Sequence, residues 1–269
     1  MNVTGTLVGY TWLGGQAFHT GNGSRAFRAD AGQSPVFPQP LSDHPSYALD
    51  INDHGVVVGC AWKPGNLPGI PHFLRAVRWA ADGTVTELGT FGGPHSCAFS
   101  INNDGWIVGR AGVSAIGAEH AFLWREGSGM IDLGTLGGSN SRAWAVNSVG
   151  QIVGESTTGE LGDFLHAFIW TANGGMVELP RLPRGHSAVA EDIDDDGNAV
   201  GYGWSADDGR EHAIMWRKTG DVIDLSRVAE GFGARFVTSR ATAISPNGLV
   251  GGTRDVEGVW SVVRWTVRP

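Results

Sequence analysis

The chain has 269 residues, of which 42 are glycine, with only 17% charged residues and a formal net charge of −8. An acidic chain with few charges lacks the basic surface that binds a phosphate backbone, so we expect no nucleic-acid partner. Its apolar runs are too short to cross a membrane, and the N-terminal residues lack the basic and apolar regions of a signal peptide. We therefore expect a cytoplasmic protein without a membrane partner. Secretion is the alternative if the chain is a processed or truncated form.

The most prominent pattern is a repeat of about 45–50 residues, which matches the period of a propeller blade. Each copy contains a turn of the type Asn-x-x-Gly followed by a Val-Gly pair. The Asn or Asp side chain supports the turn, and Gly takes the positive φ angle that a bulged hairpin needs. In chain order these segments are 1–9, 51–59, 101–109, 146–154, 193–201 and 244–251.

Each copy predicts four strands, which we call A to D. In the clearest copy, strand C covers 120–124, D covers 130–133, A covers 141–147 and B covers 151–154. Branched and aromatic residues are dense in these runs, and Gly, Asn, Asp and Ser separate them. We predict a single all-β domain, a β-propeller of about six blades of four antiparallel strands; five blades is the alternative. The repeat units are approximately 1–45, 46–95, 96–140, 141–186, 187–234 and 235–269.

The first and last blades are predicted to be incomplete. The first lacks a full A strand and the last lacks a D strand. An open strand edge at this seam is a site where another chain can pair. We therefore expect a monomer, or a dimer through the seam.

The phrases at 120–124, 132–138 and 146–156 resemble the bacterial HAF repeat. That family is best known from extracellular proteins with uncharacterised roles. The resemblance covers nearly the whole chain and is closest in the third and fourth units. It implies a bacterial protein with a β-propeller-like fold, and it transfers no catalytic residue. We expect a departure from the family's usual setting, because the N-terminal residues do not resemble a secretion signal.

The sequence contains two cysteines, Cys60 and Cys97. Two cysteines are too few for the disulfide framework of a small secreted domain. In a cytoplasmic protein we expect them to be reduced thiols. A nucleophilic role for Cys97 beside His95 is less favoured than burial, because Ala98 and Phe99 follow it.

In a propeller the A strands lie nearest the axis, so the B-to-C loops and the D-to-A junctions share one face. The B-to-C loops are long and dissimilar, and loops on a rigid scaffold usually carry binding groups. We expect a site on this face, at the mouth of the axis. The loops are 13–24, 63–72, 112–119, 157–165 and 205–211.

Three histidines stand at D-to-A junctions: His44, His95 and His186. Imidazole is the natural acid or base near neutral pH and a common metal ligand. We predict that they ring the channel mouth as catalytic groups; capping of the loops is the alternative. We expect no organic cofactor, with a divalent metal as a minority alternative. The histidines that open strand C belong to the repeat and are predicted to be structural; they are His120, His166 and His212.

Strand A of the fifth unit departs from the repeat at Glu191. The other units have apolar residues at this register, Leu49, Phe99 and Trp144. A carboxylate near the axis costs desolvation energy unless it is paired or used. We predict that Glu191 is catalytic. Arg142 and Arg240 are predicted to pair with it or to bind a ligand.

Aromatic residues recur at the entry to the same face. Trp12, Trp62 and Trp204 share one register, three residues after the Val-Gly pair, and Tyr10 and Tyr202 match two residues earlier. Aromatic walls suit sugars and flat organic ligands. We predict that these five residues bind a ligand; packing beneath the loops is the alternative.

These residues support a propeller that acts on a small molecule. The narrowly favoured hypothesis is a cofactor-independent enzyme of the lyase, cyclase or hydrolase type, in which a histidine moves a proton and Glu191 orients or shares it. The alternatives are a non-catalytic propeller that binds a glycan or another small molecule, and a protein-interaction scaffold.

Overall fold

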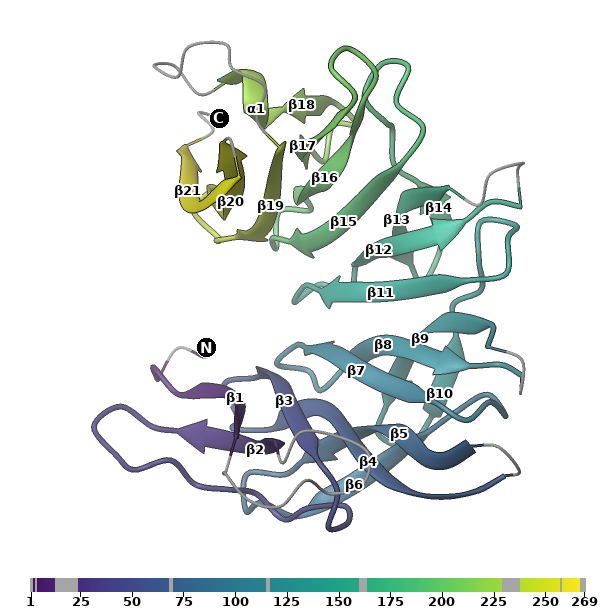
Figure 1. Cartoon of the computed structure of the whole chain (residues 1–269), viewed down its shortest axis with the longest axis vertical. Coiled ribbons are helices and arrows are strands. Elements are labelled where there is room, and N and C mark those ends of the chain that lie inside the picture. The colour runs from purple at the N-terminus through teal and green to yellow at the C-terminus, as the bar shows by residue number, and fades with distance from the viewer. Residues whose placement is uncertain are drawn as a thin grey trace. The chain divides into compact units, whose positions relative to one another are not determined.

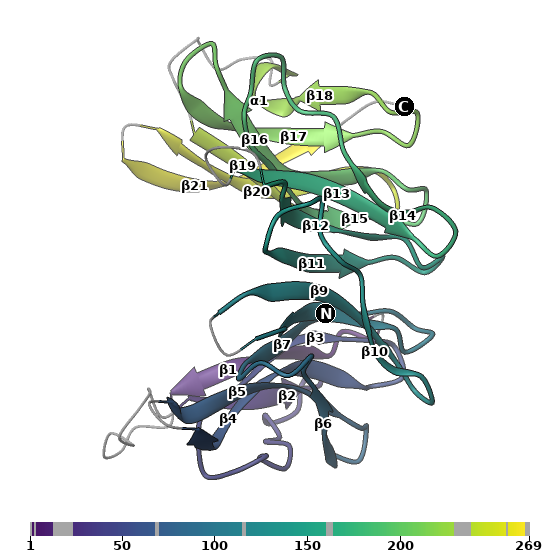
Figure 2. The ribbon, with the colours of Figure 1, turned by 90° about the vertical axis from the view of Figure 1, so that its right-hand side faces the viewer.

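The computed structural model describes residues 2, 4–12, 24–67, 70–114, 117–159, 164–228, 238–256 and 258–266. They form antiparallel sheets and one short helix, α1 (Leu225–Val228), as Figures 1 and 2 show. The all-β prediction is therefore confirmed. The chain divides into two compact units, Met1–Leu133 and Gly134–Pro269, which we describe separately. The predicted single domain over residues 1–269 stays a prediction. No helix in the described part of the chain is long and apolar enough to cross a membrane.

The first unit contains three sheets. The first sheet pairs β1 (Leu7–Trp12) with β2 (Ser24–Ala29), and one bridge joins Arg28 to Val36. The other two sheets follow chain order. They consist of β3 (Ser46–Ile51), β4 (Val57–Leu67), β5 (Ile70–Trp79) and β6 (Val85–Gly89), and of β7 (Ser96–Ile101), β8 (Ile107–Gly112), β9 (Glu119–Arg125) and β10 (Gly129–Asp132). Most of the predicted loop 63–72 is therefore strand.

The second unit also contains three sheets in chain order. They consist of β11 (Ser141–Val146), β12 (Ile152–Thr157), β13 (Leu165–Thr171) and β14 (Gly175–Glu178); of β15 (Ala188–Ile193), β16 (Ala199–Ser205), β17 (Arg210–Trp216) and β18 (Val222–Asp224); and of β19 (Thr238–Ile244), β20 (Leu249–Val256) and β21 (Val259–Thr266). Among the described residues, four sheets have four strands, and the first and last are incomplete. This agrees with six blades rather than five.

The recurring Val-Gly pair has a steric cause. A side-chain Cβ at Gly59 would lie 1.9 Å from the carbonyl oxygen of Tyr47, and one at Gly201 would lie 1.9 Å from that of Val189. The first two strands of these sheets thus approach too closely for any residue except glycine.

Hydrogen bonds that repeat from sheet to sheet hold neighbouring sheets together. In the first unit, the side-chain amide of Asn2 donates to the carbonyl of Asn52, and that of Asn52 donates to the carbonyl of Asn102. The carboxylate of Asp50 accepts from the backbone N–H of Ile101 in the next sheet. Asp192 does the same for Ile244 in the second unit. These polar residues of the repeat are structural.

The third and fourth strands of each complete sheet share a contact between a basic side chain and a carboxylate. It joins the first residue of the repeated Arg/His-Ala phrase to an acid on the fourth strand. The pairs are Arg75–Glu87 at 2.9 Å, His120–Asp132 at 2.8 Å, His166–Glu178 at 3.0 Å and His212–Asp224 at 2.8 Å. The structural role predicted for the three histidines agrees with these contacts.

Cys60 of β4 and Cys97 of β7 form a disulfide, with their Cα atoms 5.0 Å apart. The prediction of reduced thiols is therefore wrong in this structure. A cysteine count says nothing about register, whereas the repeat brings the second strand of one sheet against the first strand of the next. The two cysteines occupy facing positions on these strands and are almost completely buried.

Candidate functional site

Glu191 lies at a β-bulge that recurs in the repeat. In five sheets the pairing of the first and second strands skips one residue of the first strand. An unpaired bulge residue leaves the ladder, and its side chain is re-aimed. The direction of the Glu191 side chain is thus set by a bulge that recurs in the other sheets. The skipped residues are Leu49, Phe99, Trp144, Glu191 and Thr242.

A second carboxylate, Glu155 of β12, influences Glu191. Burial raises the pKa of Glu191, the negative charge of Glu155 raises it further, and the positive charge of Arg240 opposes both. The side chain of Glu155 is only 5% exposed. Little water therefore screens the effect of its negative charge on Glu191. Glu191 consequently keeps its proton to a higher pH than an ordinary carboxyl group.

The two predicted arginines have other carboxylates as ion-pair partners. Arg142 Nη1 lies 3.1 Å from Glu155 Oε1, and Arg240 Nη2 lies 2.6 Å from Glu211 Oε2. Arg240 still acts on Glu191 through its charge. If Glu191 is protonated, the two guanidinium groups balance the two remaining carboxylates. We call these five side chains, together with Tyr202, the Glu191 cluster.

Tyr202 completes this cluster from β16. The guanidinium carbon of Arg240 lies 4.3 Å from the centre of its ring, within the range of a cation–π contact. Burial, followed by the surrounding carboxylates, raises the pKa of Tyr202 to about 12, against the effect of Arg240. The hydroxyl group therefore stays protonated at neutral pH and can donate a hydrogen bond.

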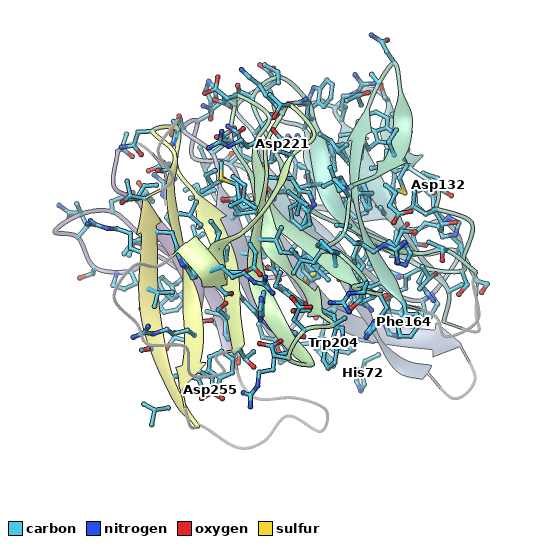
Figure 3. The ribbon with its side chains drawn as sticks, turned by 90° about the horizontal axis from the view of Figure 1, so that it is seen from above. His72, Asp132, Phe164, Trp204, Asp221 and Asp255 are labelled. Carbon is cyan, nitrogen blue, oxygen red and sulfur yellow. A yellow bond between two sulfur atoms is a disulfide. The ribbon has the colours of Figure 1, made fainter. Side chains whose placement is uncertain are left out.

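His186 belongs to a stack of rings in the second unit. Its ring centre lies 4.3 Å from that of Phe164 and 5.1 Å from that of Trp204. Figure 3 labels Phe164 and Trp204. The Nδ1 atom of His186 is buried and has no hydrogen-bond partner among the described residues. The structure thus joins one predicted histidine to one predicted tryptophan.

In the first unit, His95 accepts a hydrogen bond at Nδ1 from the backbone N–H of Leu74, at 3.1 Å. This contact requires the tautomer with its proton on Nε2. Burial and then the nearby charge of Arg75 lower the pKa of His95, which favours the neutral ring. The ring centre of Trp62 is 6.1 Å away. These contacts support the capping alternative for His95.

His44 and Tyr10 have separate surroundings. The ring of His44 lies 4.8 Å from that of His72, and its Nδ1 lies 3.3 Å from the hydroxyl of Ser42. Tyr10 is 55% exposed and meets Tyr47 edge to face, with ring centres 4.9 Å apart. The side chain of Trp12 lies outside the described residues. His44 and His95 belong to the first unit and His186 to the second, so their common site stays a prediction.

Glu155 and Glu211 were missed by sequence reasoning. Glu155 stands directly after the Val-Gly pair, at the register of Tyr10 and Tyr202. Comparing this register across all units, rather than only its tyrosines, identifies Glu155 as a departure. Glu211 precedes the repeated His-Ala phrase and has no comparable signal.

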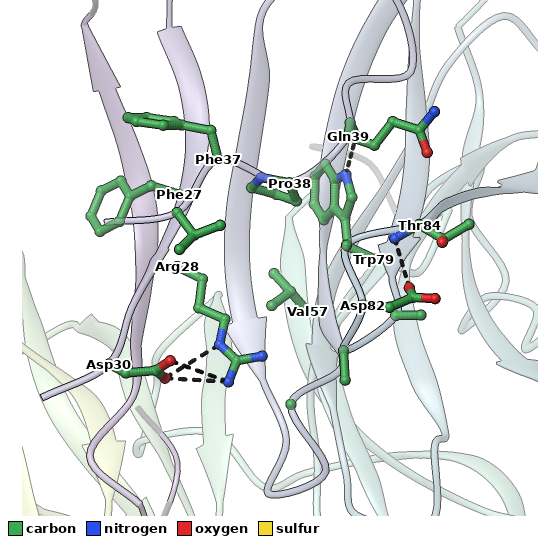
Figure 4. Close-up of a pocket in the computed structure, with 15 residues that line it drawn as sticks. Phe27, Arg28, Asp30, Phe37, Pro38, Gln39, Val57, Trp79, Asp82 and Thr84 are labelled. Carbon is green, nitrogen blue, oxygen red and sulfur yellow. Dashed lines mark hydrogen bonds and ion pairs between the residues drawn. The ribbon is translucent and has the colours of Figure 1, made fainter. Parts of the chain in front are cut away.

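A cavity of about 400 Å³ was also missed (Figure 4). It lies in the first unit, and its lining includes Phe27, Arg28, Phe37 and Trp79. None of the predicted site residues lines it. It adjoins Gly55 in the turn between β3 and β4 and residues 80–84 in the turn between β5 and β6. These turns belong to the face opposite the predicted one.

Within the described ranges, no group of three or more His, Cys, Asp or Glu side chains could hold a metal ion. The segment 192–197 has the pattern Asp-x-Asp-x-Asp-Gly, which is similar to the start of a calcium-binding loop. In the structure it forms the end of β15 and a turn. Its first carboxylate, Asp192, accepts backbone hydrogen bonds from Ile193 and Ile244.

Comparisons with known proteins identify the fold. No family model matches the chain, and no curated protein matches it. The structure is similar to the crystal structure of TolB from Acinetobacter baumannii, with a TM-score of 0.56 and 14% sequence identity. The match covers 93% of this chain and spans 60% of the length of that one. At this identity the likeness shows the fold alone: the chain has a β-propeller fold of about six blades, with the first and last incomplete.

Proposed function

We propose that the second unit acts on a small polar molecule at the Glu191 cluster, as a cofactor-independent enzyme of the hydrolase, lyase or cyclase type. The observation that carries this proposal is the raised pKa of the Glu191 carboxyl group, which is influenced by Arg240 and by buried Glu155, itself paired with Arg142. Perturbed titratable groups gather at catalytic sites more often than elsewhere on a protein.

In this proposal Glu191 is the general acid. Its neutral carboxyl group donates a proton to a leaving oxygen or to a carbonyl oxygen of the substrate. The hydroxyl of Tyr202 and the guanidinium of Arg240 stabilise negative charge that develops on the substrate. Glu155, paired with Arg142, keeps the proton on Glu191 before the reaction.

The first experiment measures the acid itself. The side-chain carbons of the glutamates are followed by NMR across pH, in the wild type and in Glu155→Gln. We expect the raised pKa of Glu191 to fall in the variant, because a neighbouring negative charge is removed. An unchanged titration of Glu191 would contradict the proposed coupling.

The second experiment tests function with neutral sugars, sugar acids and lactones as probes. Bound probes are detected by thermal shift, and turnover is followed by NMR. We expect Glu191→Gln to reduce turnover by roughly 100-fold or more while binding persists. The matched control is Leu49→Gln, which puts the same amide at the equivalent bulge of the first unit. The proposal fails if no probe is bound, or if Glu191→Gln turns over every bound probe at the wild-type rate.

The stack of Phe164, His186 and Trp204 supports a second candidate, non-catalytic binding of a sugar or a flat organic ligand. Under this hypothesis Trp204→Ala abolishes probe binding, whereas Glu191→Gln does not change it. The same probe panel therefore distinguishes the two candidates.

A further inference from the structure

The first sheet lacks the fourth strand that completes four of its sister sheets. Where it is complete, that strand carries an acid followed by leucine: Glu87-Leu88, Asp132-Leu133, Glu178-Leu179 and Asp224-Leu225. Phe37 and Pro38 stand at the corresponding positions of the first sheet. Proline has no backbone N–H to donate, so Pro35, Pro38 and Pro40 cannot extend the pairing. Only the bridge between Arg28 and Val36 remains.

The cavity of about 400 Å³ opens beside this interrupted strand. Its walls combine polar and apolar groups in similar proportion, and the apolar side chains include Phe27, Phe37, Pro38, Val57 and Trp79. Trp79 is held in place because its indole N–H donates to the carbonyl of Gln39 at 2.8 Å (Figure 4). Phe37 remains 44% exposed. A volume of this size, with aromatic side chains and a few polar groups in the lining, is typical of small-molecule sites.

Arg28 presents a guanidinium edge to the cavity. Its Nε and Nη2 atoms face Asp30, at 3.3 Å, and Asp30 also accepts a 2.6 Å hydrogen bond from Thr6. Nη1 points away from Asp30 and toward Gly55 of the lining. A Cβ built on Gly55 would lie 3.0 Å from this atom. The contact with Asp30 thus orients Arg28 and leaves Nη1 directed at the cavity lining.

The other acid of the lining, Asp82, lies at the tip of a turn and is exposed. It accepts a hydrogen bond from the backbone N–H of Thr84 at 2.9 Å. Water screens its charge much more than that of a group inside the cavity. Asp30, which also lines the cavity, is paired with Arg28 and accepts from Thr6, so Arg28 Nη1 is the charged donor that faces a bound anion.

We propose that this cavity binds a small molecule with a flat apolar body and one carboxylate group. The body lies between the aromatic walls, and the carboxylate accepts from Arg28 Nη1. A hydrogen bond between charged groups adds specificity to the apolar contact. This site is separate from the Glu191 cluster and does not depend on the function proposed there.

The test uses three probes of the same shape: 2-naphthoate, neutral 2-naphthylmethanol and cationic 2-naphthylmethylammonium. Binding is followed through the NMR signal of the Trp79 indole N–H. We expect 2-naphthoate to bind about tenfold more tightly than the alcohol, and the ammonium compound to bind most weakly. In Arg28→Gln the affinity for 2-naphthoate should fall about tenfold, while that for the alcohol changes less than about twofold.

Arg25→Gln is the matched control, because Arg25 lies on the same strand and does not line the cavity. It should bind 2-naphthoate as the wild type does. If Arg28→Gln does not fold, Arg28→Lys replaces it and should retain the preference for the anion. An unmoved Trp79 signal, equal binding of 2-naphthoate to Arg28→Gln, or tighter binding of the ammonium compound would each overturn the proposal.

Discussion

His212 is held between two carboxylates inside the second unit. Its Nδ1 lies 2.8 Å from Asp224 and its Nε2 lies 2.9 Å from Asp208, and the residue is only 5% exposed. The hydrogen bond to Asp224 is the main cause that raises the pKa of His212, against the effect of burial. The repeat supplies the first carboxylate, whereas Asp208 comes from the loop between β16 and β17.

This arrangement predicts a pH-dependent contribution to stability. Because the pKa of His212 is higher in the folded than in the unfolded chain, its stabilising effect is complete below pH of about 6.5 and is lost as pH rises through the folded value. We expect His212→Asn to lower the free energy of unfolding by roughly 1–3 kcal/mol at low pH and by less at high pH. Denaturant unfolding at about pH 6 and about pH 9 measures this difference. An equal loss at both values would contradict it.

At the scale of strands, one position of the repeat contacts the neighbouring sheet, and the type of contact differs from sheet to sheet. The residue after the Val-Gly pair meets the residue that follows a serine in the next sheet's first strand; these serines are Ser46, Ser96 and Ser239. This contact is a pair of rings at Tyr10–Tyr47, a disulfide at Cys60–Cys97 and a cation–π contact at Tyr202–Arg240. The repeat therefore leaves this position free to vary as a pair.

The disulfide at this register predicts a measurable loss on reduction. Its separation of 37 residues implies a stabilisation of roughly 3–4 kcal/mol from loop closure. We expect the double variant Cys60→Ala, Cys97→Ala to lose about that much, and a reductant to destabilise the wild type but not the variant. The disulfide would be contradicted if the reductant has no effect on the wild type and both cysteines react with an alkylating agent after unfolding without reductant. The prediction of reduced thiols would then hold. A persistent disulfide favours the secreted alternative for localisation.

The repeat predicted the strands and the incomplete end blades because each strand type recurs with the same turns and glycines. The site was predicted only in part. Glu191, which departs from the repeat, does lie in one neighbourhood with the predicted residues Tyr202, Arg142 and Arg240. Glu155 can be found as a departure within its register, but its contact with Glu191 could not be predicted, because the bulge at Glu191 sets a side-chain direction that strand alternation does not describe. The cavity was missed because its cause is a strand that fails to form.

At the scale of the whole molecule, β21 is the last strand that the structure describes. Val262 on this strand is 88% exposed, and Trp260 is 56% exposed. The equivalent position of every earlier sheet holds an alanine that is at most 2% exposed: Ala26, Ala76, Ala121, Ala167 and Ala213. In three of these sheets the alanine N–H donates to a serine hydroxyl of the following sheet. An uncovered apolar strand edge favours association with another chain.

We therefore expect reversible self-association through β21 at high protein concentration. Val262→Lys should reduce it severalfold in sedimentation velocity experiments, because a charge on an edge strand opposes pairing. Val149→Lys is the control, since Val149 is 66% exposed but lies in a turn. A wild type that stays monomeric at every concentration, or a Val149→Lys variant that dissociates equally, would contradict this expectation.

The amide contacts from Asn2 to Asn52 and from Asn52 to Asn102 advance by one complete repeat at each step. Each repeat thus brings both the donor for its successor and the acceptor for its predecessor. A duplicated repeat would already carry the donor and the acceptor for these hydrogen bonds. If a repeat were deleted, its two neighbours could form the same hydrogen bond with each other. The number of blades can therefore change during evolution through gene duplication or loss, without any new contact having to arise between neighbours.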